Sequence, residues 1–109
     1  MDDRLAQRMR SALARRKGVT EQKMFGGLCF LLNGNMLCGS SKHGFMFRVG
    51  KERHAEALSR PGASPMEMNG RRFGGFVRVD PRLCTDRQLP GWVALAHAYV
   101  ASLPPKEKQ

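Results

Sequence analysis

The chain has 109 residues, the length of one domain with a single core. Its 19 Lys and Arg residues stand against 9 Asp and Glu, a formal net charge of +10 that favours anionic partners such as nucleic acid or an acidic protein surface. Apolar runs such as residues 28–32 are too short to span a membrane, and the polar N-terminus does not resemble a secretory signal. With three cysteines, the chain is expected to be cytoplasmic and without a disulfide framework.

An amphipathic helix is predicted over residues 2–16. Leu5, Met9, Ala12 and Leu13 recur at helical spacing, and Gly18 is expected to end the helix. The basic residues that surround this helix are interpreted mainly as its solvated face.

The segment from residue 19 to residue 49 is predicted to form three strands. Two apolar runs flank Asn33-Gly34, a dipeptide typical of a two-residue hairpin turn. Phe45, Phe47 and Val49 then alternate with other residues, which indicates a strand with one buried face.

The second half of the chain is predicted to contain a short helix over Lys51–Ser59, a hairpin and a last helix. The hairpin runs from Met66 to Val79 around a turn at Asn69-Gly70. Thr85 and Gln88 have the spacing of a capping box before the last helix. The helix itself has one apolar stripe, with Trp92 and Tyr99 beside it; the stripe is composed of Leu89, Val93, Ala96, Val100 and Leu103.

These elements predict one α+β domain over residues 1–109, ordered from about residue 2 to 104, with 105–109 as a tail. The expected architecture has two layers, an antiparallel sheet with helices on one face. The expected order is helix, three strands, helix, two strands, helix.

A Phe-Gly-Gly phrase occurs twice, within residues 23–30 and within residues 71–78. A phosphate-binding glycine loop requires a helix after the glycines, whereas both phrases continue into strands. Each glycine pair is therefore predicted to lie at a bulge or bend within or between strands, with Phe25 and Phe73 buried.

Several segments carry a family resemblance: "GVTEQKMFGGLCFLLNGNMLCG", "FRVG", "RPGASPMEMNGR", "GFVRVD" and "WVALAHAYVASLPP". The chain resembles the N-terminal domain of the TfoX/Sxy competence-regulator family, as a single-domain member. The most recognisable point is Met24-Phe25-Gly26-Gly27, a motif with a structural role. The resemblance implies the small α+β fold expected above, and a bacterial regulator of natural-transformation genes that assists the cAMP receptor protein at promoters. Full-length regulators of the family carry a second, C-terminal helical domain.

Neither a catalytic site nor a metal site is predicted, and no cofactor is expected. The cysteines and histidines lack the spacing of zinc ligands, and no nucleophile elbow or dinucleotide fingerprint occurs. The residues considered are Cys29, Cys38, Cys84, His43, His54 and His97. We therefore expect a protein without enzymatic activity.

Two of the cysteines are predicted to face each other. A two-residue turn at Asn33-Gly34 places Cys29 opposite Cys38, at a position where side chains approach closely. The main interpretation is a pair of reduced core thiols, and the alternative is a cross-strand disulfide that forms under oxidation.

In the second hairpin, a turn at Asn69-Gly70 pairs Met68 with Arg71, Glu67 with Arg72, and Met66 with Phe73. This register predicts that Met66 and Phe73 share the core face.

The outer face of the sheet is expected to carry basic and apolar side chains together. Its members are Arg48, Arg72, Phe76 and Arg78, with Met46 among them. This composition suits a protein interface, including that of a homodimer, and it also suits single-stranded nucleic acid. A third interpretation is a solvated face in which Arg72 pairs with Glu67.

The sequence thus predicts a regulatory, protein-binding module that is an accessory of transcription, with the transcription machinery as partner by resemblance and no association with membranes. Direct nucleic-acid binding through the basic sheet face is the alternative.

Overall fold

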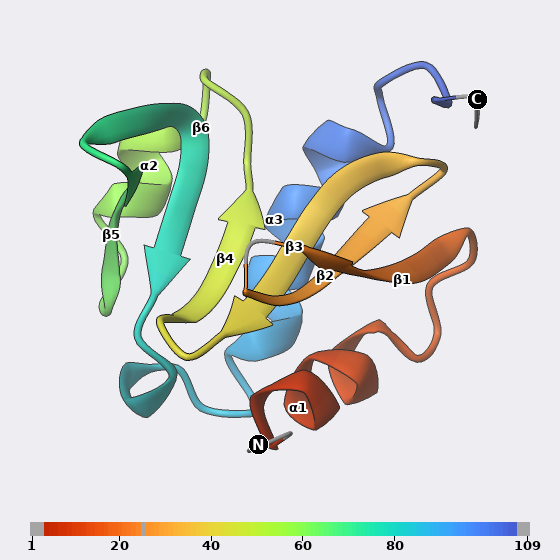
Figure 1. The fold of residues 1–109 in the computed structure, drawn as a ribbon, viewed down its shortest axis with the longest axis horizontal. Helices are drawn as coiled ribbons and strands as arrows, with labels where there is room; N and C mark the ends of the chain where they lie inside the picture. Colours follow the sequence, from red (N-terminus) through yellow and green to blue (C-terminus); the bar gives the residue numbers. More distant parts are fainter. Residues whose placement is uncertain (1–3, 25, 107–109) are drawn as a thin grey trace.

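The computed structural model describes residues 4–24 and 26–106 (Figure 1). These residues form an α+β fold in which a six-stranded antiparallel sheet, in the order β1-β2-β3-β4-β6-β5, carries its helices on one face. The elements are α1 (Arg4–Leu13), β1 (Val19–Met24), β2 (Gly27–Leu32), β3 (Asn35–Ser41), β4 (Gly44–Arg48), α2 (His54–Leu58), β5 (Ala63–Met68), β6 (Arg71–Val79), the 3₁₀ turn η1 (Pro81–Leu83) and α3 (Leu89–Val100).

The predicted fold class is confirmed, and one strand is added to the predicted order. Four strands, rather than three, lie between α1 and α2. The additional strand, β1, is an edge strand that pairs only with β2. Its four central residues are all exposed, so the sequence shows no alternation of apolar and polar residues that would mark it as a strand.

Both predicted Asn-Gly turns are present. Asn33 and Gly34 have φ of 51° and 85°, and Asn69 and Gly70 have φ of 52° and 77°. Positive φ at both central residues gives a turn whose twist matches that of the flanking strands. Each Asn-Gly pair therefore closes a two-residue hairpin.

The main core lies between the sheet and the helices. Helix α1 packs against β3, α3 packs against β3 and β4, and these two helices pack against each other; α2 packs against β5 and β6 (Figure 1). Phe45, Phe47 and Val49 point into this core as predicted, and all three are buried. Trp92 of α3 stacks on Phe47 with ring centroids 5.4 Å apart, which joins the helical layer to the centre of the sheet.

Two helices are shorter than predicted: α1 ends before residue 16, and α2 spans His54–Leu58 rather than Lys51–Ser59. Helix α1 ends at Leu13 in a tight turn, in which the amide of Arg16 donates to the carbonyl of Leu13. Helix α3 starts at Leu89, directly after the predicted capping box. There the amide of Thr85 donates to Gln88 Oε1 (2.9 Å), and the amide of Gln88 donates to Thr85 Oγ1 (3.2 Å).

Arg8 of α1 is an exception to the prediction that the basic residues of this helix are mainly solvated. Its guanidinium donates to the carbonyls of Pro81 (3.2 Å) and Cys84 (2.5 Å) and to Asp86 Oδ1 (2.6 Å). It also lies 5.2 Å from the centre of the Phe45 ring. Arg8 thus connects α1 to the segment between β6 and α3.

The end of the described chain lies against the β2–β3 turn. The amide of Lys106 donates to the carbonyl of Asn33 (2.9 Å), and Asn35 Nδ2 donates to the carbonyl of Pro104 (2.9 Å). None of the helices in residues 4–24 and 26–106 has the length and apolar character needed to cross a membrane.

Candidate functional site

The two glycines of the first Phe-Gly-Gly phrase lie where β1 gives way to β2, as predicted. Met24 faces Gly27 across the β1–β2 hairpin, and Gly26 has a φ of 73° in the connecting turn. A Cβ atom on Gly27 would collide with the carbonyl oxygen of Ser40 in β3, so this position requires the close approach of two backbones. Phe25, predicted to be buried, lies outside the described residues.

The second phrase forms a bulge within β6, again as predicted. Gly75 has a φ of 86°, and its carbonyl accepts hydrogen bonds from the amides of Val49 (2.8 Å) and Gly50 (3.1 Å). The bulge therefore joins β6 to the loop that follows β4.

The bulge changes the register predicted for the second hairpin. The pair Glu67–Arg72 forms as predicted, but the next pair is Pro65 with Val77, so residues 73–76 lie opposite Met66 alone. The prediction that Met66 and Phe73 share the core face is wrong. Met66 is buried on the other face of the sheet. The prediction that Phe73 is buried is also wrong: Phe73 is 39% exposed, because the extra residues carry the chain away from the ladder.

A second bulge separates the two cysteines that were predicted to face each other. Leu37 is an extra residue in β3, so Cys29 lies opposite Gly39 and Cys38 lies opposite Phe30. Because one added residue reverses the direction of the side chains, Cys38 enters the main core and Cys29 points to the opposite face. The predicted pairing is wrong. Both thiols are free and buried, and burial raises the pKa of each.

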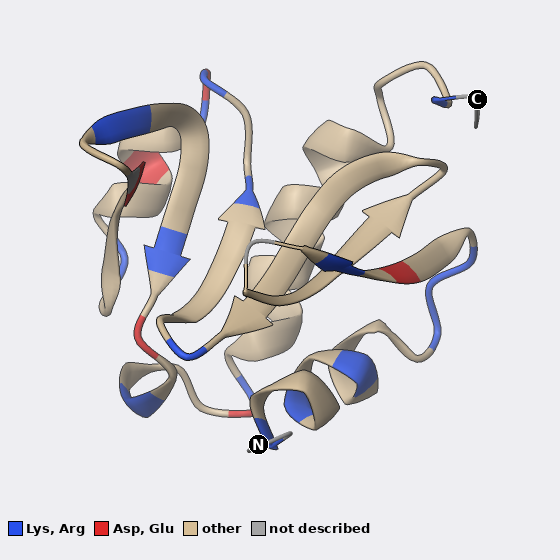
Figure 2. Ribbon diagram, viewed as in Figure 1, with Lys and Arg blue, Asp and Glu red and all other residues tan. Residues whose placement is uncertain are grey.

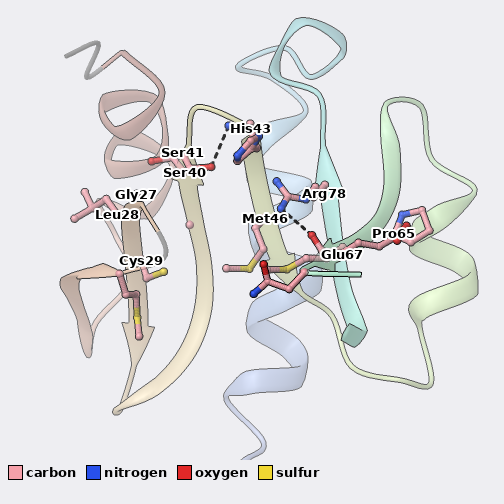
Figure 3. A pocket seen from close by; sticks show the side chains of 15 residues that line it. Gly27, Leu28, Cys29, Ser40, Ser41, His43, Met46, Pro65, Glu67 and Arg78 are labelled. Carbon is pink, nitrogen blue, oxygen red and sulfur yellow. Dashed lines mark hydrogen bonds between the residues drawn. The ribbon is translucent and has the colours of Figure 1, made fainter. Parts of the chain in front are cut away.

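The face of the sheet without helices carries a groove of about 590 Å³. Three sulfur-containing side chains, Cys29, Met46 and Met66, are buried there, with Met24 and Met36 packed beside them. The thiol of Cys29 and the side chain of Met46 point towards the space between the β2–β3 strands and the β5–β6 hairpin (Figure 3). We call this feature the sulfur-lined groove.

Three of the four residues predicted for the interaction surface lie on this face. Arg48 pairs with Phe76, and Arg78 pairs with Met46, in the β4–β6 ladder. Arg78 lines the sulfur-lined groove, and its guanidinium donates to the carbonyl of Glu67 (3.3 Å) (Figure 3).

The fourth predicted residue, Arg72, lies beyond the β6 bulge. Its side chain is 75% exposed and pairs with Glu67 at 3.9 Å. Arg72 does not line the sulfur-lined groove.

Arg48 belongs to a second cavity of about 540 Å³, which we call the basic cavity. The basic cavity lies between the loop after β4, the β6 bulge and the end of α3, and it also contains Lys51, Arg53 and Tyr99. Figure 2 shows Lys and Arg at the end of β4 and in the loop that follows it. The sequence did not predict these three residues. Tyr99 is brought to Arg48 by the packing of α3, and Lys51 and Arg53 lie in an irregular loop that strand alternation does not cover.

The family model described as TfoX N-terminal domain matches residues 11–99. The chain belongs to the TfoX N-terminal domain family. The resemblance found from the sequence segments is thereby confirmed. No curated protein and no solved structure matches the chain.

In this TfoX N-terminal domain, the matched segment contains the whole lining of the sulfur-lined groove and nearly all of the basic cavity. The histidines considered as ligands are separated. His43 is exposed in the β3–β4 turn, His54 Nε2 donates to the carbonyl of Phe76 (3.2 Å), and His97 lies on α3. Within residues 4–24 and 26–106, no group of three or more His, Cys, Asp or Glu side chains is placed to hold a metal ion.

Proposed function

We propose that this TfoX N-terminal domain is a non-enzymatic regulatory module that binds a partner protein through the sulfur-lined groove, as an accessory of transcription. The groove itself is the observation that supports this proposal. Met46 and Met66 line it on a sheet face that no described helix covers. Methionine side chains are unbranched and polarisable, so they adapt to an inserted apolar side chain.

The partner that fits is an acidic protein surface that inserts an apolar side chain into the groove. The chain carries a formal net charge of +10. Every described carboxylate except that of Glu52 already lies in an ion pair, so few negative charges remain to neutralise the excess. Arg78 at the groove supplies a local cation for an acidic partner.

The transcriptional part of the proposal rests on the family. Its members are tied to the control of competence genes, which makes the transcription machinery the first source of partners to examine. A second copy of this chain is a less favoured occupant, because two surfaces with the same positive charge repel each other.

The test is capture of the partner by the full chain from native lysate, before and after nuclease treatment, followed by binding of the purified partner. Met66→Gln keeps the side-chain length but adds polar atoms to the groove, and should weaken binding at least tenfold. Leu83→Gln is the matched control, because Leu83 is 57% exposed and lies outside the groove.

Binding of an acidic protein that survives nuclease and is lost only in Met66→Gln supports the proposal. Equal binding by both variants, or capture that nuclease abolishes, contradicts it. Sedimentation analysis at increasing protein concentration identifies a homodimer, and a dimer disrupted by Met66→Gln would replace the acidic partner with a second copy.

Direct nucleic-acid binding remains the second candidate, because Arg48 and Arg78 lie near each other in the β4–β6 ladder and form no ion pair within the described residues. For single strands, log affinity falls with log salt by about 0.7 per phosphate contact. Replacing Arg48, Arg72 and Arg78 by Ala should then reduce the slope by about two units. Tight binding at physiological salt that survives Phe76→Ala but is abolished by the triple change would favour this candidate over the protein module.

A further inference from the structure

The basic cavity forms where three segments meet, and glycines permit their approach. A Cβ atom on Gly75 would lie 3.2 Å from the carbonyl carbon of Gly50 and 3.3 Å from the nitrogen of Lys51. A Cβ atom on Gly50 would lie 2.6 Å from the ring of Tyr99. The second Phe-Gly-Gly phrase therefore brings the backbone of β6 against the loop after β4, while Gly50 leaves room for an aromatic ring from α3.

Arg48 is held in this cavity by two aromatic rings. Its guanidinium carbon lies 5.6 Å from the ring centroid of Phe76 and 5.6 Å from that of Tyr99. Arg48 forms no ion pair with any described carboxylate. The rings thus restrict a guanidinium whose N–H groups remain available to an anion.

Two further cations line the same cavity. Lys51 and Arg53 are exposed, and neither forms an ion pair within residues 4–24 and 26–106. The backbone amides of Lys51, Glu52 and Arg53 donate no hydrogen bond to another described residue. Glu52 is the single carboxylate in the lining, so the cavity has an excess of positive charge and of hydrogen-bond donors.

We propose that the basic cavity is a binding site for the phosphate group of a nucleotide, either free or within a single strand. A guanidinium matches two phosphate oxygens with two parallel N–H donors, and Lys51 and Arg53 supply the remaining charge. The volume of about 540 Å³ is that of a small-molecule site. The half-buried Phe76 ring lies next to the cations and offers a surface for the base. This site lies outside the sulfur-lined groove and does not depend on the proposed partner protein.

The test is a titration of the ¹⁵N-labelled full chain, at about 0.15 M salt, with inorganic phosphate, AMP and an eight-residue oligothymidylate. Saturable shifts confined to the amides of Gly50, Lys51 and Gly75 are expected with AMP or with the oligonucleotide. A site for free nucleotides saturates with AMP, whereas a site for nucleic acid requires the oligonucleotide; either result supports the phosphate site and identifies its source.

Arg48→Met retains a long side chain between the rings and should weaken binding at least tenfold. Lys17→Met removes the same charge from an exposed position outside the cavity, and should change affinity less than twofold. Glu52→Gln removes the one carboxylate and should tighten binding about twofold to threefold. If Arg48→Met fails to fold, the double variant Lys51→Met with Arg53→Met replaces it, because both of these side chains are exposed.

Absence of saturable shifts with all three probes would overturn the proposal. Shifts with inorganic phosphate alone would also overturn it, because they would indicate an adventitious ion only. Equal weakening by Arg48→Met and Lys17→Met would show that net charge, rather than this cavity, attracts the ligand.

Discussion

Replacing Arg8 with Met tests whether α1 is held to the rest of the fold by a charged group. The change removes the donors to the carbonyls of Pro81 and Cys84 and to Asp86, while it keeps most of the aliphatic length of the side chain. The change also removes the guanidinium from its position over the ring of Phe45.

The expected cost follows from the burial of each contact. The two carbonyl bonds are partly buried and contribute about 1 kcal/mol each. The contact with the Phe45 ring adds about 0.5–1 kcal/mol. The ion pair with Asp86 contributes little, because the Asp86 side chain is 80% exposed. The variant should therefore lose about 2–3 kcal/mol of unfolding free energy, which lowers Tm by roughly 10 °C in a domain of this size.

Urea denaturation followed by tryptophan fluorescence measures this loss, since Trp92 is buried in the core. Arg15→Met is the matched control: Arg15 is exposed after the end of α1, and its removal should cost under about 0.5 kcal/mol. Asp86→Asn should cost under about 1 kcal/mol. If Arg8→Met costs no more than Arg15→Met, or if Asp86→Asn accounts for the whole loss, the reasoning from the carbonyl bonds is refuted.

Three further predictions concern the glycine turn, the thiols and pH. Gly26→Ala should cost about 1–2 kcal/mol of unfolding free energy, because alanine is strained at the positive φ of this position. Gly27→Ala should cost at least as much, because its methyl group would collide with the β3 backbone. Thermal melts that place either variant within about 0.5 kcal/mol of the parent chain, the scatter of ordinary surface changes, would contradict this. Cys29 and Cys38 should resist a thiol reagent until urea unfolds the chain, since burial raises the pKa of both thiols. Mild oxidation should leave the mass of the native chain without a loss of two protons; a disulfide between the two cysteines would disprove their placement on opposite faces. Burial lowers the pKa of His97 below 6.5, so the native state binds fewer protons than the unfolded state and the unfolding free energy should fall as pH drops from 7 towards 5. His97→Gln should remove the part of this pH dependence that His97 causes; the same pH profile in the variant and the parent chain would contradict the prediction.

Local features of the sequence determined the turns, the helices and the fold class. Asn33-Gly34 and Asn69-Gly70 adopt positive φ at low cost in any context, so each specified a hairpin without help from the rest of the chain. The apolar stripe of α3 and its capping box are likewise set by residues within a few positions of each other. The order of these elements was enough to predict an antiparallel sheet with helices on one face.

Tertiary structure decided the register between neighbouring strands. The bulge at Leu37 separates the cysteines, and the bulge at residues 73–76 moves Met66 from the expected core to the helix-free face. An odd shift in register changes which residues of two neighbouring strands share a face, and whether a bulge forms depends on packing against distant elements.

The candidate sites depended on tertiary structure for the same reason. The predicted positions of Arg48, Phe76 and Arg78 on one face followed from strand alternation and are correct. Tyr99 reaches Arg48 only because α3 packs across the sheet, a contact between residues about half the chain apart. Periodicity records which face of an element is apolar, whereas the docking of one element on another sets which side chains share a cavity.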